Sequence, residues 1–201
     1  MTRILLFIRA PVRGKVKSRL AKAIGDDMAL DIYKYLVCHT LKTLEESSYP
    51  FSLCYYPPDS EAILKNWLGS SCSYVPQHGA DLGKRMENAF IQAFADGMDK
   101  VVLVGSDIPR LSVSIIGQAF NALATKDAVI GPAHDGGYYL IGFNRSTFLP
   151  DIFQGIAWST DSVYNETMNI FDKAGFSIHV LAGLSDVDTL RDLLSSLHGR
   201  L

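Results

Sequence analysis

Short apolar runs and longer amphipathic segments alternate along most of the chain. Residues 101–104 are apolar and mostly β-branched, which is typical of a strand buried on both faces of a parallel sheet. From Asp26 to Leu44, apolar residues recur at helical spacing and predict an amphipathic helix. The same criteria predict further strands at residues 3–8, 51–56, 73–76, 128–130, 138–143 and 176–181. They predict further helices at 61–68, capped by Asp59, from Asp81, from Ser112, at 161–174 and from about Asp188.

The alternation of strands and helices predicts the fold class. Successive strand–helix units form a mainly parallel sheet with helices on both faces, so we expect one compact α/β domain over residues 1–201. The turn at Asp135-Gly136-Gly137 leads directly into the strand predicted at 138–143, without an intervening helix. This indicates one antiparallel strand late in the sheet.

Composition and charge narrow the classes of function. The 201 residues are 48% hydrophobic and carry a formal net charge of −2, which gives no global electrostatic reason to bind nucleic acid or a membrane surface. Any binding of polyanions must be local, and no apolar run is long enough to span a membrane. The three cysteines, Cys38, Cys54 and Cys72, are widely spaced and predict buried thiols in a reducing compartment. We therefore expect a cytoplasmic protein, whereas no feature of the sequence indicates its oligomeric state.

Asp107 follows the apolar strand at 101–104 and so lies near its carboxyl end, where open α/β sheets bind ligands. Pro109 cannot extend the sheet and holds Asp107 on a short turn. A carboxylate in this place is suited to hold a divalent cation against a phosphate. The alternative is that Asp107 only caps the turn before the next helix. Because Ser112 is better placed to cap that helix, the pattern favours a functional aspartate.

A cluster of basic residues follows the first predicted strand. It consists of Arg9, Arg13, Lys15, Lys17 and Arg19, in a loop that also holds Pro11 and Gly14. The loop leaves the carboxyl end of its strand and so faces the same crevice as Asp107. Glycine allows close backbone approach to a ligand, and cationic side chains bind phosphate oxygens. Phosphate binding is therefore favoured over a solvated basic turn, although the loop matches neither the P-loop nor the dinucleotide-binding glycine pattern.

A second polar segment precedes and opens the helix predicted from Asp81. Asp81 itself is sufficiently explained as the cap of that helix. Gln77 and Gly79 lie in the approach to the helix and Arg85 lies one turn inside it, where backbone amides and polar side chains could bind a base or a phosphate.

Two acidic segments lie later in the chain. Asp135 is explained equally well by a hairpin turn and by a carboxylate that orients or deprotonates an acceptor. Asp186 and Asp188 point to the same side of the backbone if their segment is extended, and such a pair can flank a metal ion. From that segment alone, a role for Asp188 as the cap of the last helix is favoured.

Six motifs occur in order along nearly the whole chain. They are Phe7-x-Arg9-Ala10-Pro11-x-x-Gly14-x-x-Lys17-Ser18-Arg19-Leu20, Asp81-Leu82-Gly83-x-Arg85-Met86, Gly105-Ser106-Asp107-Ile108-Pro109, Asp135-Gly136-Gly137-Tyr138-Tyr139-Leu140-Ile141-Gly142, Trp158-Ser159 and Asp186-Val187-Asp188-Thr189. Together they resemble a bacterial glycosyltransferase-like family, first catalogued as a domain of unknown function, in the nucleotide-diphospho-sugar transferase superfamily. The resemblance implies the GT-A fold, a Rossmann-like mixed sheet that binds a nucleotide and a divalent metal ion.

The resemblance also implies roles for individual residues. The residues expected to bind nucleotide are Arg9, Ala10, Pro11, Gly14, Lys15, Lys17, Arg19, Gln77, Gly79, Arg85 and Ser106. Asp107 is the expected ligand of Mg²⁺ or Mn²⁺. Asp186 and Asp188 supply a second metal carboxylate, because related nucleotidyltransferases such as phospholactate guanylyltransferase carry a similar Asp-x-Asp-Thr. Asp135 would face the acceptor as the catalytic carboxylate.

Two departures from the family pattern separate the hypotheses on function. Pro109 stands where sugar transferases of this fold usually carry the second aspartate of Asp-x-Asp, and Arg9 stands where lysine is expected. The first departure favours the single-aspartate geometry of nucleotidyltransferases. The leading hypothesis is a metal-dependent transferase that uses a nucleotide sugar and a small-molecule acceptor. The alternatives are a nucleotidyltransferase, which joins a nucleoside triphosphate to a small phosphorylated or acidic acceptor with release of pyrophosphate, and a non-catalytic nucleotide-binding module.

Overall fold

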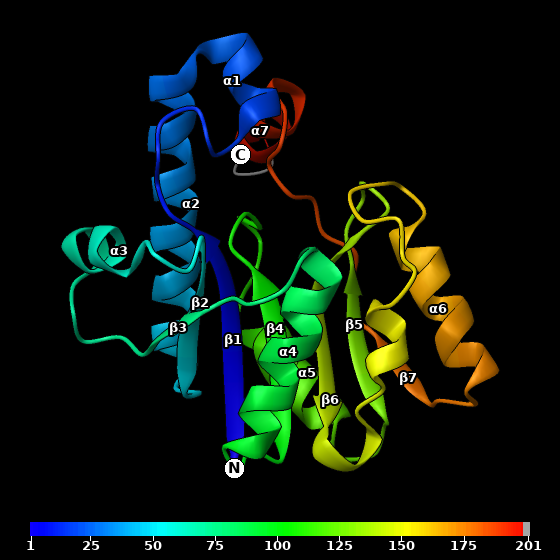
Figure 1. The fold of residues 1–201 in the computed structure, drawn as a ribbon. Helices are drawn as coiled ribbons and strands as arrows, with labels where there is room; N and C mark the ends of the chain where they lie inside the picture. The colour runs from blue at the N-terminus through cyan, green and yellow to red at the C-terminus, as the bar shows by residue number, and fades with distance from the viewer. Residues whose placement is uncertain (199–201) are drawn as a thin grey trace.

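The computed structural model describes residues 1–198 and is built around one seven-stranded sheet in the order β3-β2-β1-β4-β6-β5-β7 (Figure 1). The strands are β1 (Thr2–Arg9), β2 (Phe51–Tyr56), β3 (Tyr74–Pro76), β4 (Lys100–Gly105), β5 (Ala128–Pro132), β6 (Tyr138–Asn144) and β7 (Ile178–Val180). Strand β6 runs antiparallel to both of its neighbours, and the other neighbouring strands are parallel. The predicted late antiparallel strand is thus confirmed.

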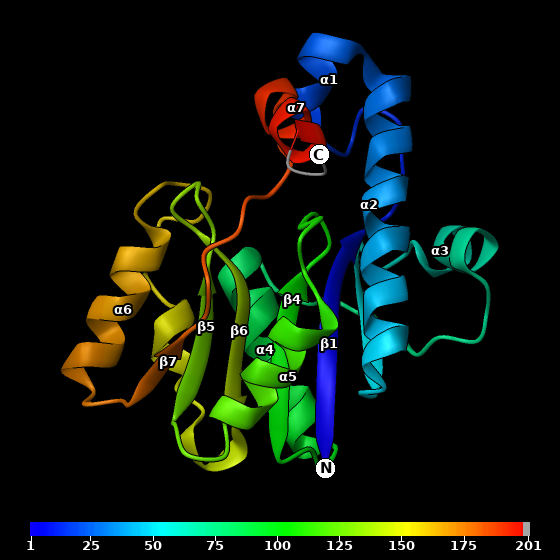
Figure 2. The same ribbon diagram turned by 180° about the vertical axis from the view of Figure 1, so that it is seen from behind.

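Helices cover both faces of the sheet (Figures 1 and 2). They are α1 (Ser18–Ile24), α2 (Asp26–Ser47), α3 (Glu61–Leu68), α4 (Leu82–Ala95), α5 (Val113–Ala122), α6 (Val163–Lys173) and α7 (Leu190–His198), with short 3₁₀ helices at Arg145–Thr147 and Pro150–Phe153. Leu41, Leu64 and Ile116 belong to the apolar core on one face, where α2, α3 and α5 lie. Phe90 of α4 and Phe171 of α6 belong to the core on the other face. The predicted α/β fold class is confirmed.

Strands β1 and β4 form the switch point of the sheet, because β2 and β3 lie on one side of this pair and the remaining strands lie on the other. The two strands are parallel, with Leu6 opposite Val104 and Phe7 opposite Gly105. Their carboxyl ends therefore meet at one edge, which is where open α/β sheets bind ligands. The basic loop begins at the end of β1 and Asp107 follows the end of β4.

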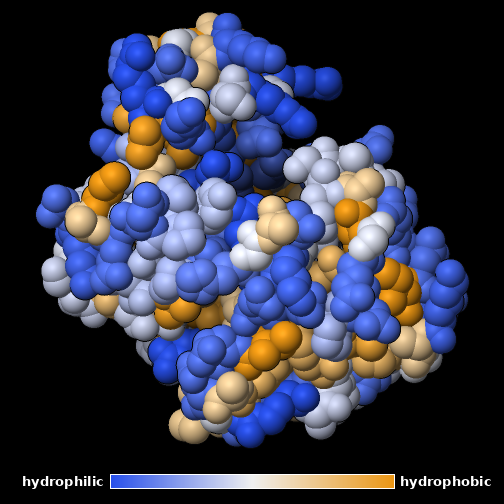
Figure 3. All heavy atoms as spheres, in the orientation of Figure 1, coloured by the Kyte–Doolittle hydropathy of each residue, from blue (hydrophilic) through white to orange (hydrophobic). Residues whose placement is uncertain are grey.

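Helices α1 and α7 lie beside each other beyond this edge, at the top of Figure 1, although they come from opposite ends of the chain. The surface is hollowed between these helices and the body of the sheet, and the visible atoms there belong mainly to hydrophilic residues (Figure 3). Helix α1 was not predicted, since it has only seven residues and buries only Leu20.

The capping interactions confirm two predictions and correct one. Asp81 accepts a hydrogen bond from the backbone amide of Lys84 at 2.8 Å, and Ser112 accepts one from the amide of Ile115 at 3.3 Å. The prediction that Asp59 caps α3 is wrong, because Ser60 is the residue that precedes its first turn.

The cysteines are less uniform than predicted. Cys54 is buried, and this burial raises the pKa of its thiol to about 12. Cys72 is half-buried, and Cys38 is exposed, so the prediction of a buried thiol is wrong for Cys38. Among the residues that the structure describes, no helix combines the length and the apolar character needed to cross a bilayer.

Candidate nucleotide and metal site

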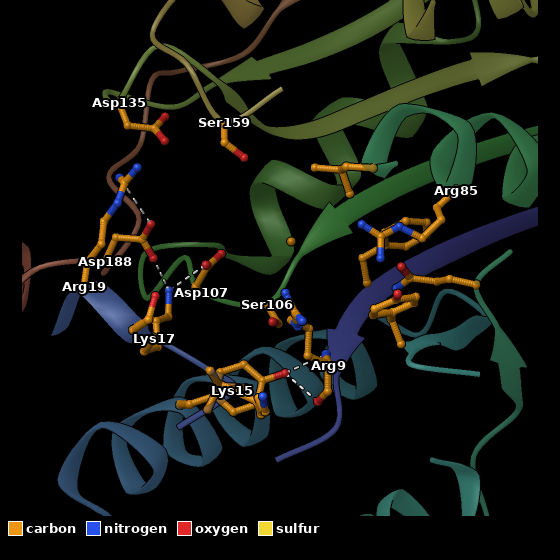
Figure 4. Close-up of a pocket in the computed structure, with 18 residues that line it drawn as sticks. Arg9, Lys15, Lys17, Arg19, Arg85, Ser106, Asp107, Asp135, Ser159 and Asp188 are labelled. Carbon is orange, nitrogen blue, oxygen red and sulfur yellow. Dashed lines mark hydrogen bonds and ion pairs between the residues drawn. The ribbon is translucent and has the colours of Figure 1, made fainter. Parts of the chain in front are cut away.

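A cavity of about 540 Å³ opens at the carboxyl ends of β1 and β4. Its charged lining residues are Arg9, Lys15, Lys17, Arg19, Arg85, Asp107, Asp135 and Asp188, which come from segments far apart in the sequence (Figure 4). Gln77 and Ser106 also line it, and both are nearly fully buried. The structure therefore brings basic and acidic residues together in one cavity. The basic residues come from the segment between the end of β1 and the start of α1 and from α4, and the acidic residues come from three later segments.

Lys17 lies between two of these acidic residues. Its Nζ donates hydrogen bonds to Oδ2 of Asp107 and to Oδ1 of Asp188, each at 2.7 Å, and its side chain is only 5% exposed. Burial alone would lower the pKa of Lys17, but the two carboxylates outweigh this effect and hold the pKa above its ordinary value. The backbone of Lys17 is left-handed (φ 47°, ψ 45°), an uncommon conformation for a residue other than glycine. The chain thus directs this ammonium group between Asp107 and Asp188.

Asp107, Asp186 and Asp188 form a cluster that we call the acidic trio, since each offers a carboxylate oxygen within 4.8 Å of the others. The pKa of Asp186 is raised to about 7 by burial and by the negative charges of Asp135, Asp107 and Asp188. The backbone links the trio as well, because the amide of Val187 donates to the carbonyl oxygen of Asp107 at 3.1 Å.

The cap at the start of α7 is formed by Thr189 and Asp192. Oδ2 of Asp192 accepts from the amide of Thr189 at 2.7 Å, and Oγ1 of Thr189 accepts from the amide of Asp192 at 3.3 Å. These two residues cap the helix reciprocally. The alternative that Asp188 caps the last helix is therefore wrong, and its carboxylate faces Lys17 instead.

Tyr56, at the end of β2, lies close to two arginines of the cavity. The guanidinium carbon of Arg85 is 4.2 Å from the centre of the Tyr56 ring, and that of Arg9 is 5.7 Å away. Arg9 is also fixed by Tyr33, whose hydroxyl accepts from the Arg9 amide at 2.7 Å and donates to the Arg9 carbonyl at 2.8 Å. Sequence reasoning missed both tyrosines. The only available signal for Tyr56 was its place at the carboxyl end of a predicted strand.

Gln77 has a defined orientation in the same cavity. Its Nε2 donates to the carbonyl oxygens of Cys54 at 2.7 Å and of Ile8 at 3.4 Å. Both amide protons are thereby used within the protein, which leaves the side-chain oxygen as the group available to a ligand.

Four of the residues expected to bind nucleotide do not line the cavity: Ala10, Pro11, Gly14 and Gly79. Ala10 is buried in the core. A Cβ atom on Gly79 would lie 2.7 Å from the backbone nitrogen of Arg85, so this glycine allows its loop to pass close to the start of α4. Arg13 turns away from the cavity and forms an ion pair with Asp27 at 2.6 Å.

A second, smaller cavity of about 270 Å³ adjoins the first and shares Asp107, Asp135 and Asp188 with it. Asp186 lines this second cavity but not the first. Asp135 also shapes its own turn, because its Oδ1 accepts a hydrogen bond from the amide of Gly137 at 2.9 Å. The structural and the functional explanations of Asp135 are therefore compatible.

Comparison with solved structures places this fold and site in a class. The chain superposes with a TM-score of 0.92 and 42% identity on a candidate nucleotide-diphospho-sugar transferase from Desulfovibrio desulfuricans G20, over 96% of this chain and 84% of that chain. The chain is a transferase of the nucleotide-diphospho-sugar transferase superfamily, with a GT-A-like fold. Within this class it belongs to the family DUF2064, described as an uncharacterized protein conserved in bacteria, which matches residues 40–160. No curated protein matches the sequence.

Two more distant structures share the fold. CMP:2-keto-3-deoxy-manno-octonic acid synthetase in complex with CTP matches with a TM-score of 0.62 and 9% identity, over 100% of this chain and 99% of that one. Rv0371c from Mycobacterium tuberculosis H37Rv in complex with manganese matches with a TM-score of 0.58 and 14% identity, over 98% and 97%.

Proposed function

We propose that the chain is a metal-dependent transferase that takes a nucleotide-activated sugar as its donor. The observation that supports this most directly is that the acidic trio lies beside the cavity that four of the five basic loop residues line. A nucleoside diphosphate carries several negative charges, so it needs cationic side chains along its phosphates. Carboxylates and phosphates repel each other, so a carboxylate cluster next to the phosphates needs a metal ion between the carboxylates and the phosphates.

The nucleotide would lie along the larger cavity. Lys15 and Arg19 are placed to bind phosphate oxygens, and the side-chain oxygen of Gln77 is placed to accept a hydrogen bond from a base. Tyr56, which lies close to Arg9 and Arg85, offers an aromatic surface in the same cavity.

The acidic trio suits Mg²⁺ or Mn²⁺, because both ions prefer oxygen ligands and carboxylates in particular. The ammonium of Lys17 already lies between Asp107 and Asp188, which supports the proposal that these carboxylates bind a cation. When bound, a divalent ion would neutralise charge on the departing nucleoside diphosphate. The distantly similar Rv0371c, solved with manganese, is consistent with this choice of ion.

In the proposed reaction, an acceptor hydroxyl oxygen forms a bond to the anomeric carbon of the donor sugar. The bond between that carbon and the phosphate oxygen breaks, and its electron pair leaves with the nucleoside diphosphate. Asp135 lines both cavities and would take the proton of the acceptor hydroxyl. The cationic loop side chains would stabilise the charge that develops on the leaving phosphate.

A nucleotidyltransferase is the second candidate. Pro109 removes the second aspartate of the Asp-x-Asp motif, and Asp188 reaches the same place from the end of the chain instead. In this reaction the acceptor oxygen would attack the α-phosphorus of a nucleoside triphosphate, and pyrophosphate would leave. The distantly similar synthetase was solved in complex with CTP, which is a nucleoside triphosphate.

The products of turnover distinguish the two candidates. The protein is incubated with panels of nucleotide sugars and nucleoside triphosphates, with Mg²⁺ or Mn²⁺ and a metabolite extract as the source of acceptor. Release of nucleoside diphosphate supports glycosyl transfer, and release of pyrophosphate supports nucleotidyl transfer. Asp107→Asn should release neither product, and Asp172→Asn, on the exposed end of α6, is its matched control and should behave like the wild type. Metal-dependent nucleotide binding without either product would contradict both candidates.

A further inference from the structure

The second cavity is lined by acidic residues without the basic residues that line the first. Its charged lining residues, among those the structure describes, are the four aspartates Asp107, Asp135, Asp186 and Asp188. None of its lining residues is a lysine, an arginine or a histidine. Arg9, Lys15, Lys17, Arg19 and Arg85 line the larger cavity only. We call the smaller cavity the acidic–aromatic compartment.

The remaining walls of this compartment are largely apolar. Phe7, Met86 and Trp158 line it, and the rings of Tyr138 and Trp158 meet edge to face with centroids 6.4 Å apart. The position of Trp158 is fixed by Gly83, where a Cβ atom would come within 2.4 Å of the indole Nε1. An aromatic wall opposite a set of carboxylates suits a ligand that has both an apolar face and hydroxyl groups.

A polar group of the compartment also lacks a strong partner within the protein. Among the described residues, the hydroxyl of Tyr138 has one hydrogen-bond contact, with the sulfur of Met86 at 4.0 Å. Sulfur is a weak acceptor, so this contact replaces little of what water would offer the hydroxyl. A ligand hydroxyl in the compartment would supply a better partner.

From these features we infer that the second substrate, the acceptor of the proposed transfer, binds in the acidic–aromatic compartment as a neutral or cationic hydroxyl compound with an apolar face. Phosphorylated and carboxylate-bearing acceptors are excluded from it. This inference rests on the proposed function, because it takes the larger cavity as the nucleotide site. It also argues against the acidic or phosphorylated acceptor expected for a nucleotidyltransferase.

Electrostatics give the reason for the exclusion. A carboxylate that arrives in this compartment would lie among four aspartates, three of which have carboxylate oxygens within 4.8 Å of one another. Without a metal ion, the ammonium of Lys17 offsets one of the four aspartate charges, and a divalent cation that displaced it would offset two. The phosphates of a bound nucleotide would face the cationic side chains of the larger cavity. The compartment thus repels a second anion even when the metal ion and the nucleotide are present.

Trp158 provides a direct measurement of binding. The chain has two tryptophans, so Trp67→Phe leaves the indole in the compartment as the only one. Quenching of its fluorescence is titrated with glucose, glucosamine, glucuronate and glucose 6-phosphate, without nucleotide and again with Mn²⁺ and a saturating nucleoside diphosphate. If Trp67→Phe fails to fold, the wild type is titrated and the signal that Trp158→Phe removes is used.

We expect glucose and glucosamine to quench Trp158, and the two anions to bind about tenfold more weakly or not at all when nucleotide is present. Thr160→Lys, at the exposed rim of the compartment, should strengthen glucuronate binding, whereas Thr160→Gln should not. Equal binding of anionic and neutral sugars would overturn the inference, and so would the failure of all four probes to quench. Nucleotide binding is measured separately by calorimetry and tests the proposed function. The sugar titrations without nucleotide do not depend on that measurement, so a failure of the proposed function can be distinguished from a failure of this inference.

Discussion

The ammonium of Lys17 lies 2.7 Å from Oδ2 of Asp107, across 90 positions of sequence, and at the same distance from Oδ1 of Asp188. The ammonium group thus contacts two of the three carboxylates that would bind a divalent ion. Lys17 and a bound metal ion would therefore compete for the same carboxylates. Once a nucleotide is present, its phosphates offer the ammonium an alternative partner.

Lys17→Met should bind Mn²⁺ about tenfold more tightly than the wild type in the absence of nucleotide, because the competing positive charge is gone. Its affinity for a nucleoside diphosphate should fall, because a phosphate ligand is lost. Electron paramagnetic resonance of free Mn²⁺ measures the first quantity and calorimetry the second. Lys22→Met removes an exposed charge from α1 and should change neither. Weaker Mn²⁺ binding by Lys17→Met would show that Lys17 supports the metal site rather than competing for it.

Asp107→Asn should abolish metal-dependent nucleotide binding while the fold stays intact. Asparagine keeps the size of the side chain but removes the charge that holds a divalent cation. Calorimetry with nucleotide and Mn²⁺ measures the loss, and circular dichroism with thermal unfolding checks the fold. Unchanged nucleotide affinity in this variant would remove Asp107 from the metal site.

Tyr56→Leu should weaken nucleotide binding about fivefold. The change removes the ring that holds both Arg9 and Arg85, and such contacts contribute about 1 kcal/mol at partly exposed sites. Tyr56→Phe retains the ring and should bind nucleotide like the wild type. If both variants bind equally well, the stacked arginines do not order the nucleotide site.

The sequence was sufficient to predict the parts of this fold that depend on local pattern. Continuous apolar runs identify the buried strands, and the position of Asp107 after one of them places it at the ligand-binding edge. The hairpin at Asp135 likewise indicates the antiparallel strand β6. These inferences need only the periodicity of neighbouring residues and the general topology of parallel sheets.

The direction of individual side chains could not be predicted in the same way. Lys15 and Lys17 line the larger cavity and Gly14, from the same loop, does not, because the left-handed turns of the loop set which residues face inward. The contact of Lys17 with Asp188 joins residues 171 positions apart and depends on how α1 and α7 pack. No spacing rule along one sequence encodes such a contact.

Two glycine-to-alanine changes should have opposite effects on stability. Gly83→Ala would place a Cβ atom within 2.4 Å of Trp158 and 2.5 Å of the Phe153 carbonyl, so it should lower the free energy of unfolding by about 1–3 kcal/mol. Gly117→Ala lies in α5 with no atom within 4 Å of its Cβ position. It should raise the free energy of unfolding by about 0.5–1 kcal/mol, since alanine loses less backbone entropy in a helix.

Urea unfolding of both variants measures these differences, and Trp158 fluorescence reports on the compartment at the same time. Gly83→Ala should also shift the emission of Trp158, because the indole must move away from α4 to admit the new methyl group. Gly117→Ala should leave that emission unchanged. A Gly83→Ala protein as stable as the wild type, with unchanged Trp158 emission, would mean that α4 and Trp158 are not in the close contact that shapes the acidic–aromatic compartment.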